Sequence, residues 1–427
     1  MITDSVVEKV LAQIDPQAVI DLTARLVRCN SVWDPQAGSS EAEAAALAAD
    51  WLRHRGFDVV MEAVAPGRPN VIVRWTAGPG PRTLMFEGHT DVVTPGDHSR
   101  WRHDPFGAQI ENGRMFGRGT NDTKGNLAAM LVAMAALKAS DVPLAGSIVG
   151  GVLCDEEGLM AGVQHFIDRG HADAVTAAII CEPQDGLVCI AQKGAVRARF
   201  SVIGRMSHGA MPLSGVNPAP ALARIIDGLA GLEAAAIDAV GKDPLLGWPS
   251  FTPTVVRAPS QGLPQLNVVP GEAEILVDVR SVPGQNHAHI RESLTSLASL
   301  TAKTVNDHYR GTDRQGRNRR AREVGVSVHF LSDRPCTRTE DSAPVVASAV
   351  WASGRISGRE PELAGVPGAT DGTFLWARKG IPIVTMGAGD RQVPHQVDEW
   401  VDLDQLVQTA QIYALTALHY LDPDGRR

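Results

Sequence analysis

Two hydrophobic patterns alternate along the first part of the chain. Apolar residues recur at helical spacing over 42–56, and 124–138 is apolar nearly all round, which predicts a buried helix. Short apolar runs lie beside these helices and predict buried strands. The runs are NVIVRW (70–75), TLMFEGH (83–89), SIVGGVLC (147–154) and TAAIIC (176–181). This alternation predicts an α/β fold, a mostly parallel mixed sheet sandwiched by helices.

The pattern changes near Lys193 and changes back near Pro335. Between them, strand-like runs alternate apolar and polar residues, with two helical runs interspersed, which predicts a smaller α+β domain with one solvated sheet face. A helix near 343–354, the strand IPIVTMG and an amphipathic helix at 403–421 then resume the first pattern. We therefore expect a discontinuous α/β domain, residues 1–193 and 334–427, interrupted by an inserted domain, residues 194–333.

Composition narrows the class of protein. The 427 residues, 44% of them hydrophobic, can fill two or three domain cores. No apolar run approaches the ~20 residues that cross a bilayer, and the N-terminus lacks a signal-peptide core, so we expect a cytoplasmic protein without a membrane partner. The five scattered cysteines predict no disulfide framework. The net charge of −8 argues against a nucleic-acid partner, and the six arginines of Arg310–Arg322 predict a solvated surface loop.

Histidines and carboxylates gather at the carboxyl ends of the predicted strands, in the turn before the buried helix, and in the loop after IPIVTMG. Open α/β sheets bind their ligands at the carboxyl ends of parallel strands. A single charged residue there would be ordinary, but seven point to a site. The seven residues are His89, Asp91, Asp122, Glu156, Glu157, Glu182 and His395.

So many carboxylates in one crevice would repel one another unless a cation neutralised them. Imidazoles mixed with carboxylates suit zinc, cobalt or manganese, and two ions ~3.5–4 Å apart could share a carboxylate. Asp91 can hold the imidazole N–H of His89, although an HTD triplet alone is more often a polar turn. Of Glu156 and Glu157, one can bind metal while the other acts as a base, but acids also favour a helix N-terminus.

The order of the motifs resembles that of a known family. The motifs are GHTDVV, GRGTNDTKG, DEEG, CEP, GRMSHG, NVVPGEAEILVDVR, GATDG and PHQVDE. Together they are similar to those of the acetylornithine deacetylase and succinyl-diaminopimelate desuccinylase family of two-metal peptidases and amidohydrolases. The resemblance spans about residues 20–421. It implies a zinc-peptidase-like catalytic domain with an inserted lid and dimerisation domain.

The resemblance also implies a role for each residue of the site and a cis peptide bond between Asp122 and Thr123. The implied roles are His89 and Glu182 as ligands of one ion, Glu157 and His395 as ligands of the other, Asp122 as the bridge, Glu156 as general base and acid, and Asp91 as the residue that orients His89.

The same resemblance assigns functions to the inserted domain and to one loop. His208 would reach the site of a second subunit and stabilise the oxyanion, although a histidine between Ser and Gly is more often a turn residue. Asn267 and Arg280 would grip the substrate carboxylate, for which the planar fork of arginine is suited. Without the resemblance, a salt bridge on the strand explains Arg280 equally well. Gly368 and Thr370 would line the substrate pocket.

We therefore expect a homodimeric hydrolase that uses two divalent ions, zinc in the first place, to cleave the amide bond of a small N-acyl amino acid. A carboxypeptidase, a dipeptidase, an aminoacylase or an enzyme of an unusual C–N bond could use the same metal core, with a short peptide as one possible substrate. A binding protein on a degenerate scaffold is a further alternative, against which the complete ligand set counts. A nucleotide-binding enzyme is disfavoured because GRGTNDTKG lacks the spacing of phosphate-binding loops.

Overall fold

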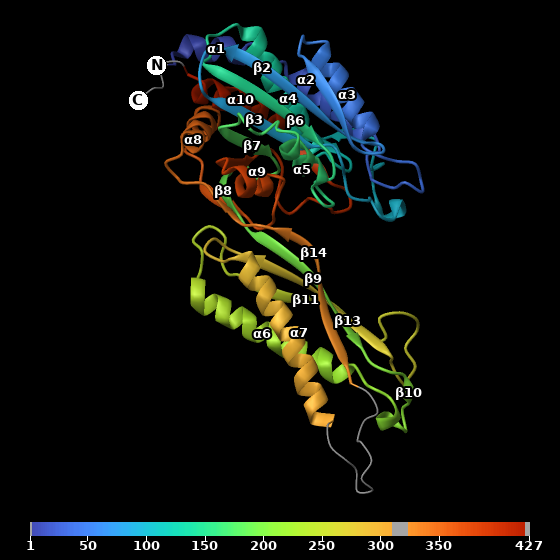
Figure 1. Cartoon of the computed structure of the whole chain (residues 1–427). Coiled ribbons are helices and arrows are strands. Elements are labelled where there is room, and N and C mark those ends of the chain that lie inside the picture. Colours follow the sequence, from blue (N-terminus) through green and yellow to red (C-terminus); the bar gives the residue numbers. More distant parts are fainter. Residues whose placement is uncertain (1, 310–322, 423–427) are drawn as a thin grey trace. The chain divides into compact units, whose positions relative to one another are not determined.

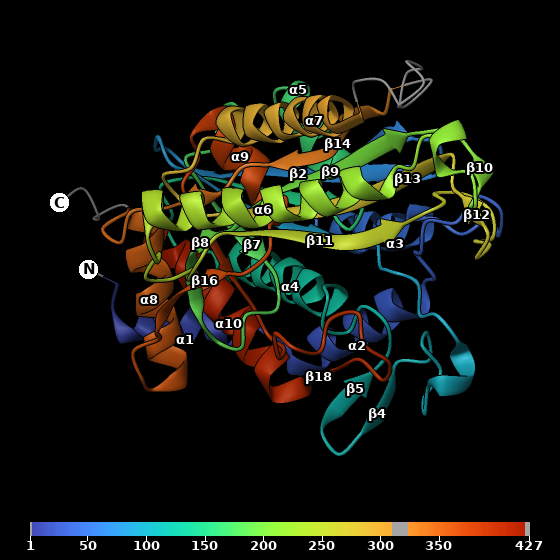
Figure 2. The ribbon, with the colours of Figure 1, turned by 90° about the horizontal axis from the view of Figure 1, so that it is seen from below.

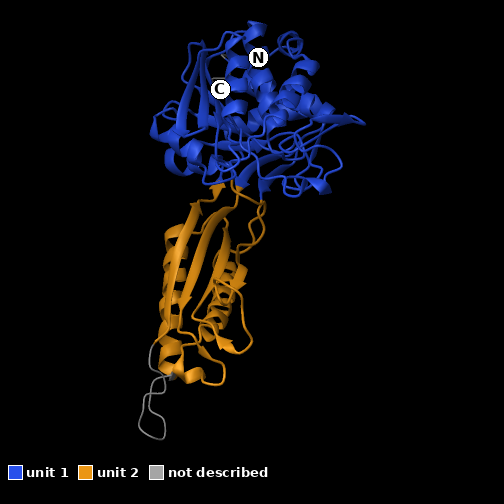
Figure 3. Ribbon diagram, turned by 90° about the vertical axis from the view of Figure 1, so that its right-hand side faces the viewer, with its two compact units in different colours: residues 1–191, 338–366, 370–427 blue, residues 192–337, 367–369 orange. Residues whose placement is uncertain are grey.

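The computed structural model describes residues 2–309 and 323–422, so the expected arginine-rich loop, 310–322, lies outside the described residues. The chain divides into two compact units (Figure 3). Unit 1 consists of residues 1–191, 338–366 and 370–427, and unit 2 of residues 192–337 and 367–369.

A nine-stranded mixed sheet forms the centre of unit 1 (Figure 1). Strands β6, β3, β7 and β17 are neighbours and run parallel to one another, whereas β1, β2 and β8 pair antiparallel. Four neighbouring strands therefore end at one edge of the sheet. The spatial order is β1 (Val59–Ala65), β2 (Arg68–Gly78), β6 (Gly146–Leu153), β3 (Thr83–His89), β7 (Ala177–Cys181), β17 (Ile383–Met386), β8 (Val188–Gln192) and β15 (Thr337–Arg338), with β16 (Leu363–Val366) paired to β8.

Helices cover both faces of this sheet, as adjacent residues of β3 demonstrate. Met85 packs in a core with Phe166 of α5 and Leu375 of α9, whereas the ring of Phe86 lies 5.7 Å from that of Tyr413 in α10. The expected α/β class is therefore confirmed. The helices of unit 1 are α1 (Asp4–Leu11), α2 (Pro16–Arg28), α3 (Ala42–Arg53), α4 (Lys124–Ser140), α5 (Ala161–Asp168), α8 (Pro344–Ser357), α9 (Gly372–Lys379) and α10 (Leu403–Tyr420).

A small antiparallel sheet in unit 1 joins two segments that are distant in the sequence. Its order is β18 (Trp400–Asp402), β5 (Arg114–Phe116) and β4 (Gln109–Glu111), and the 3₁₀ helix η1 (His98–Arg100) precedes it in the chain. Pairing of β5 with β18 brings the residues just before Asp122 close to those just after His395.

Unit 2 is a four-stranded antiparallel sheet with two long helices along one face (Figure 2). Its order is β11 (Ser250–Arg257), β13 (Glu272–Ser281), β9 (Gly194–Ile203) and β14 (Gly325–Arg334), and the helices are α6 (Ala219–Val240) and α7 (His287–Tyr309). Burial alternates along β13, with Ile275 and Val277 packed against Leu229 and Leu294 of the helices. Further short elements are β10 (Ser207–His208), β12 (Val268–Val269) and η2 (Pro212–Ser214). In the described part of the chain, no helix combines the length and apolar character required to span a bilayer.

Candidate metal centre

Five of the predicted donors form two clusters that share one carboxylate. His89, Asp122 and Glu182 form one, and Asp122, Glu157 and His395 form the other, with the ligand atoms of each within 4.8 Å of one another. The oxygens of Asp122 divide between them, since Oδ1 lies 3.2 Å from His89 Nε2 and Oδ2 lies 3.4 Å from His395 Nε2. Each cluster contains a second carboxylate besides Asp122. Glu182 Oε1 is 3.4 Å from His89 Nε2, and Glu157 Oε1 is 2.9 Å from His395 Nε2.

The parallel strands explain why these side chains converge. His89 ends β3, Glu157 follows β6, and Glu182 follows β7 directly. His395 lies in the loop after β17, and Asp122 lies just before α4, where the positive end of the helix dipole favours an anion. The Asp122–Thr123 peptide is cis, as the family resemblance implied.

Asp91 connects β3 to the turn that follows β6. Its backbone carbonyl accepts the Nδ1–H of His89 at 2.9 Å, while its carboxylate Oδ1 is 3.5 Å from the same nitrogen. The carboxylate accepts the amides of Glu156 and Glu157 at 3.2 and 3.0 Å. Although burial raises the pKa of Asp91, the bonds from His89 and from these amides lower it overall. Asp91 thus fixes the turn that carries both glutamates, and its nearest contact to His89 is through the backbone.

Glu156 is 8% exposed and belongs to neither cluster of the described residues. Burial raises its pKa well above the usual range, and the charges of Glu182 and Glu157 add to this although His89 opposes it. Glu156 thus lies next to the metal donors without being one of them. Its carboxyl group can therefore exchange a proton with a ligand that is bound at the donors.

The electrostatics of the five donors fit divalent cations. Burial and the Asp122 charge raise the pKa of Glu182 to about 7, and the bonds to Asp122 and Glu157 raise that of His395 to about 10. The pKa of Asp122 is lowered because both imidazoles donate to it. Without a cation, these groups must hold protons to limit the repulsion. Two imidazoles and three carboxylates in two clusters are a donor set that suits zinc, cobalt or manganese.

The other predicted site residues lie in unit 2 and at its boundary. His208 is exposed in β10, where its Nδ1 accepts the Ala210 amide at 3.0 Å, and the Asn267 carbonyl accepts the Gly209 amide at 2.7 Å. Arg280 forms an ion pair with Asp278 at 2.5 Å, the contact that the salt-bridge alternative predicted. Gly368 belongs to unit 2 and the buried Thr370 to unit 1. The binding roles of these residues stay predictions.

Several buried polar residues around the donors were not singled out from the sequence. Glu87 is fully buried two residues before His89, and its pKa is raised well above the usual range by burial and by the charges of Asp371 and Glu182. The other overlooked residues are Asn70, Arg118, Asn126 and Glu399, all buried. A polar residue within the apolar run 124–138 was a signal for Asn126, but no local pattern names the partners of the others.

Comparisons with known proteins show the family to which this chain belongs. The sequence model of Peptidase family M20/M25/M40 matches residues 85–419. A succinyl-diaminopimelate desuccinylase of Dinoroseobacter shibae is 31% identical, over 93% of this chain and 97% of its own, and one of Cereibacter sphaeroides strain KD131 is 32% identical, over 94% and 97%.

Solved structures share the fold over nearly the whole chain. An M20 family metallo-carboxypeptidase of Sulfolobus solfataricus superposes with a TM-score of 0.78 at 19% identity, covering 94% of this chain and 99% of its own. A dinuclear metal-binding M20 peptidase of Bacillus subtilis gives 0.67 at 15% identity, covering 95% and 98%. The resemblance inferred from the motifs is confirmed. This chain belongs to Peptidase family M20/M25/M40 and is a metal-dependent hydrolase of amide bonds.

Proposed function

We propose that this hydrolase removes the acyl group from a small N-acyl amino acid, with zinc as the resident ion of both clusters. The observation that carries the proposal is the pair of clusters joined by Asp122, with Glu156 beside them and in neither. The desuccinylase relatives, at 31–32% identity over almost the full length, support an N-acyl amino acid as the substrate class.

In this proposal, His89 and Glu182 would hold one ion and Glu157 and His395 the other, with Asp122 as the carboxylate that the two clusters share. Two bound divalent ions would supply Lewis acidity and lower the pKa of an attacking water towards ~7. Glu156 accepts the proton of that water as its oxygen attacks the acyl carbon, and then donates the proton to the leaving nitrogen as the C–N bond breaks. The products are a carboxylate and a free amine.

Residues of unit 2 and of the loop 367–370 would bind the substrate. Asn267 and Arg280 would hold its carboxylate, with the guanidinium fork exchanging Asp278 for the ligand. Gly368 and Thr370 would line the substrate pocket. His208 of a second copy of the chain would donate to the oxyanion, a contribution of about 3–4 kcal/mol in known oxyanion holes.

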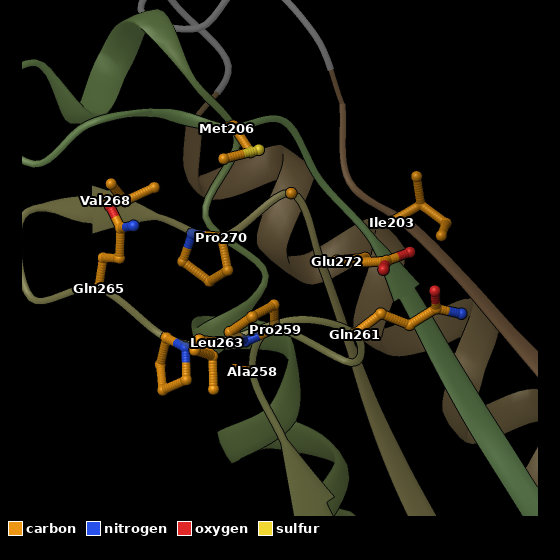
Figure 4. A pocket seen from close by; sticks show the side chains of 12 residues that line it. Ile203, Met206, Ala258, Pro259, Gln261, Leu263, Gln265, Val268, Pro270 and Glu272 are labelled. Atoms are coloured by element: carbon orange, nitrogen blue, oxygen red, sulfur yellow. The ribbon is translucent and has the colours of Figure 1, made fainter.

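A homodimer through unit 2 is part of the same proposal. A cavity of about 440 Å³ near β10 and β12 is lined by apolar residues together with Gln261, Gln265 and Glu272 (Figure 4). Leu263 is 90% exposed and Met206 65% exposed, which is unusual for side chains of this size. A second copy would cover them and bring its own His208. Light scattering after gel filtration tests this, because wild-type protein should be a dimer and Leu263→Glu should shift it towards the monomer.

The decisive test combines Glu156→Gln with a substrate panel and metal analysis. The variant should retain wild-type zinc but lose about two to four orders of magnitude in kcat, the range for a general acid–base group. The panel contains N-succinyl-diaminopimelate, N-acetylornithine, other N-acyl amino acids and dipeptides, each with and without chelator. Cleavage of dipeptides alone would indicate a dipeptidase, and normal turnover by Glu156→Gln would remove this residue from its role. Metal analysis decides between zinc, cobalt and manganese.

We also propose a cytoplasmic location. All five cysteines are free thiols, and four of them are buried. Free cysteines are the norm where the compartment is reducing. Fractionation of cells that produce the protein would test this expectation.

A further inference from the structure

Two charged residues outside the donor set form a buried ion pair next to it. Arg118 Nη1 lies 2.5 Å from Glu399 Oε2, and the residues are 2% and 0% exposed. Burying two charges is costly, and further hydrogen bonds from the remaining polar atoms offset part of that cost. Among the described residues, Arg118 Nε has no such partner, but the other polar atoms of the pair do. The partners of this pair are the backbone segments that carry two of the metal donors.

Glu399 holds the segment that leads to Asp122. Its second oxygen, Oε1, accepts the amides of Gly119, Asn121 and Asp122 at 2.9, 3.0 and 3.1 Å. Three N–H groups that converge on one carboxylate oxygen fix the path of the backbone between them. Because Asp122 is the donor that both clusters share, its position affects both.

Arg118 holds the segment that carries His395. Its Nη2 donates to the carbonyls of His395 and Thr94 at 3.3 and 3.5 Å, and its guanidinium lies 5.1 Å from the centre of the Trp101 ring. His395 has a φ of 67°, a left-handed conformation that a residue with a side chain adopts only at a cost in free energy. The bond from Arg118 helps to keep His395 in this conformation, and His395 belongs to one cluster only.

We propose that Glu399 and Arg118 are positioning residues of the metal centre and that they affect different numbers of metal sites. Glu399 sets the position of Asp122 and so acts on both metal sites, whereas Arg118 sets the backbone of His395 and acts mainly on one. Neither side chain is a donor in the two clusters. This inference rests on the proposed function, because it requires that both clusters bind metal.

The test measures zinc affinity rather than turnover. Metal-free wild-type, Glu399→Gln and Arg118→Lys proteins are titrated with zinc against a chromophoric chelator, so that two dissociation constants are obtained for each. Glutamine keeps the shape of Glu399 but not the charge that Arg118 and three amides require. Lysine keeps a positive charge to pair with Glu399 but lacks the fork that reaches the His395 carbonyl at the same time, so the bond to His395 is the contact that this variant should lose.

The expected pattern differs between the variants. Glu399→Gln should weaken both zinc sites by about 10- to 100-fold, the usual effect of removing a residue that holds a metal ligand. Arg118→Lys should weaken one site by a similar factor and leave the other unchanged. If Glu399→Gln does not fold, Arg118→Lys alone carries the test, because its one-site loss is the more specific expectation.

Leu52→Ala is the control for a general loss of stability. Leu52 is fully buried in α3 and belongs to neither cluster, and its truncation should destabilise unit 1. The inference is overturned if Glu399→Gln and Arg118→Lys both bind zinc as wild type does, if Arg118→Lys weakens both sites equally, or if Leu52→Ala weakens binding as much as they do. Wild-type protein that binds no zinc would overturn the proposed function and this inference together, whereas unchanged variants overturn the inference alone.

Discussion

Replacing Asn126 with leucine would remove a buried polar link between α4 and the loop that carries His395. Asn126 is fully buried, its Oδ1 accepts the Ala388 amide at 2.7 Å, and its Nδ2 donates to the Ala388 carbonyl at 3.0 Å. Leucine has a similar size but can form neither bond, nor the longer one of 3.4 Å from Asn126 Nδ2 to the Asn121 carbonyl. The substitution therefore leaves both backbone groups of Ala388 without this partner.

The expected loss of stability comes from the two backbone groups of Ala388. A buried backbone group that loses its hydrogen-bond partner costs about 1–3 kcal/mol, so two such groups give a loss of about 2–6 kcal/mol. Little apolar burial offsets it, because the space is tight. A Cβ on Gly387 would already lie 2.5 Å from Asn126 Oδ1. Against a total stability of ~5–15 kcal/mol, this is a large fraction.

Urea denaturation of the metal-free protein measures this loss as a change in the free energy of unfolding. Metal must be removed by chelation, since bound ions would add their own stabilisation. Asn30→Leu is the control, because Asn30 is exposed and its side chain bonds only to the nearby Val32 amide, which water can reach. A loss below about 1 kcal/mol in Asn126→Leu, or an equal loss in the control, would refute the reasoning that orphaned backbone groups dominate.

Three further predictions concern the metal, the acid range and one glycine. Zinc at about 1,000 times its Kd should stabilise unit 1 by ~4 kcal/mol for each of the two sites, ~8 kcal/mol together. Chelator should lower the calorimetric Tm of unit 1 but not that of unit 2, because both clusters lie in unit 1. The bond from His287 lowers the pKa of Asp333 in the folded protein. The stability that Asp333 contributes is therefore present above its unfolded pKa of ~3.9 and is lost as the pH falls through its folded pKa. Asp333→Asn should make the urea midpoint depend less on pH in this acid range. Gly389→Ala should lower the free energy of unfolding by about 2 kcal/mol or more, because φ is 105° at this position and the new Cβ would clash with Asn121 Oδ1. Gly354→Ala in helix α8 is the control and should be neutral or stabilising in the same unfolding assay.

The sequence was sufficient for the elements whose own pattern reports their burial. The run 124–138 is apolar nearly all round and forms α4, with nearly every residue buried. TLMFEGH forms β3, which is buried at every position. Because β3 runs parallel to its neighbours β6 and β7, acids and histidines at the ends of these three strands could be expected to meet without any knowledge of the loops.

Patterns were insufficient where an element is short or takes its partner from far away. Helix α9 (Gly372–Lys379) has only eight residues, and β16 (Leu363–Val366) only four, too few for a period to stand out. Glu399 and Arg118 are 281 positions apart, and no spacing rule connects them. The carbonyl of Asp91, which accepts the His89 N–H, could not be anticipated either, because sequence patterns identify side chains and not backbone partners.

The features that the sequence predicts and those that it does not predict have different physical origins. Donors converge because strand direction brings them to one edge, but their orientation depends on buried side chains that bind backbone of other segments. Asn70 accepts the Cys154 amide at 3.2 Å and donates to the Gly162 carbonyl at 2.8 Å, and so brackets the turn that carries Glu156 and Glu157. Asn126 does the same for the loop of His395. A chain with the same donors and apolar residues at these positions would keep the fold class, since the pattern is unchanged. It would hold its donors less firmly, because metal affinity falls when the groups that fix the ligands are removed.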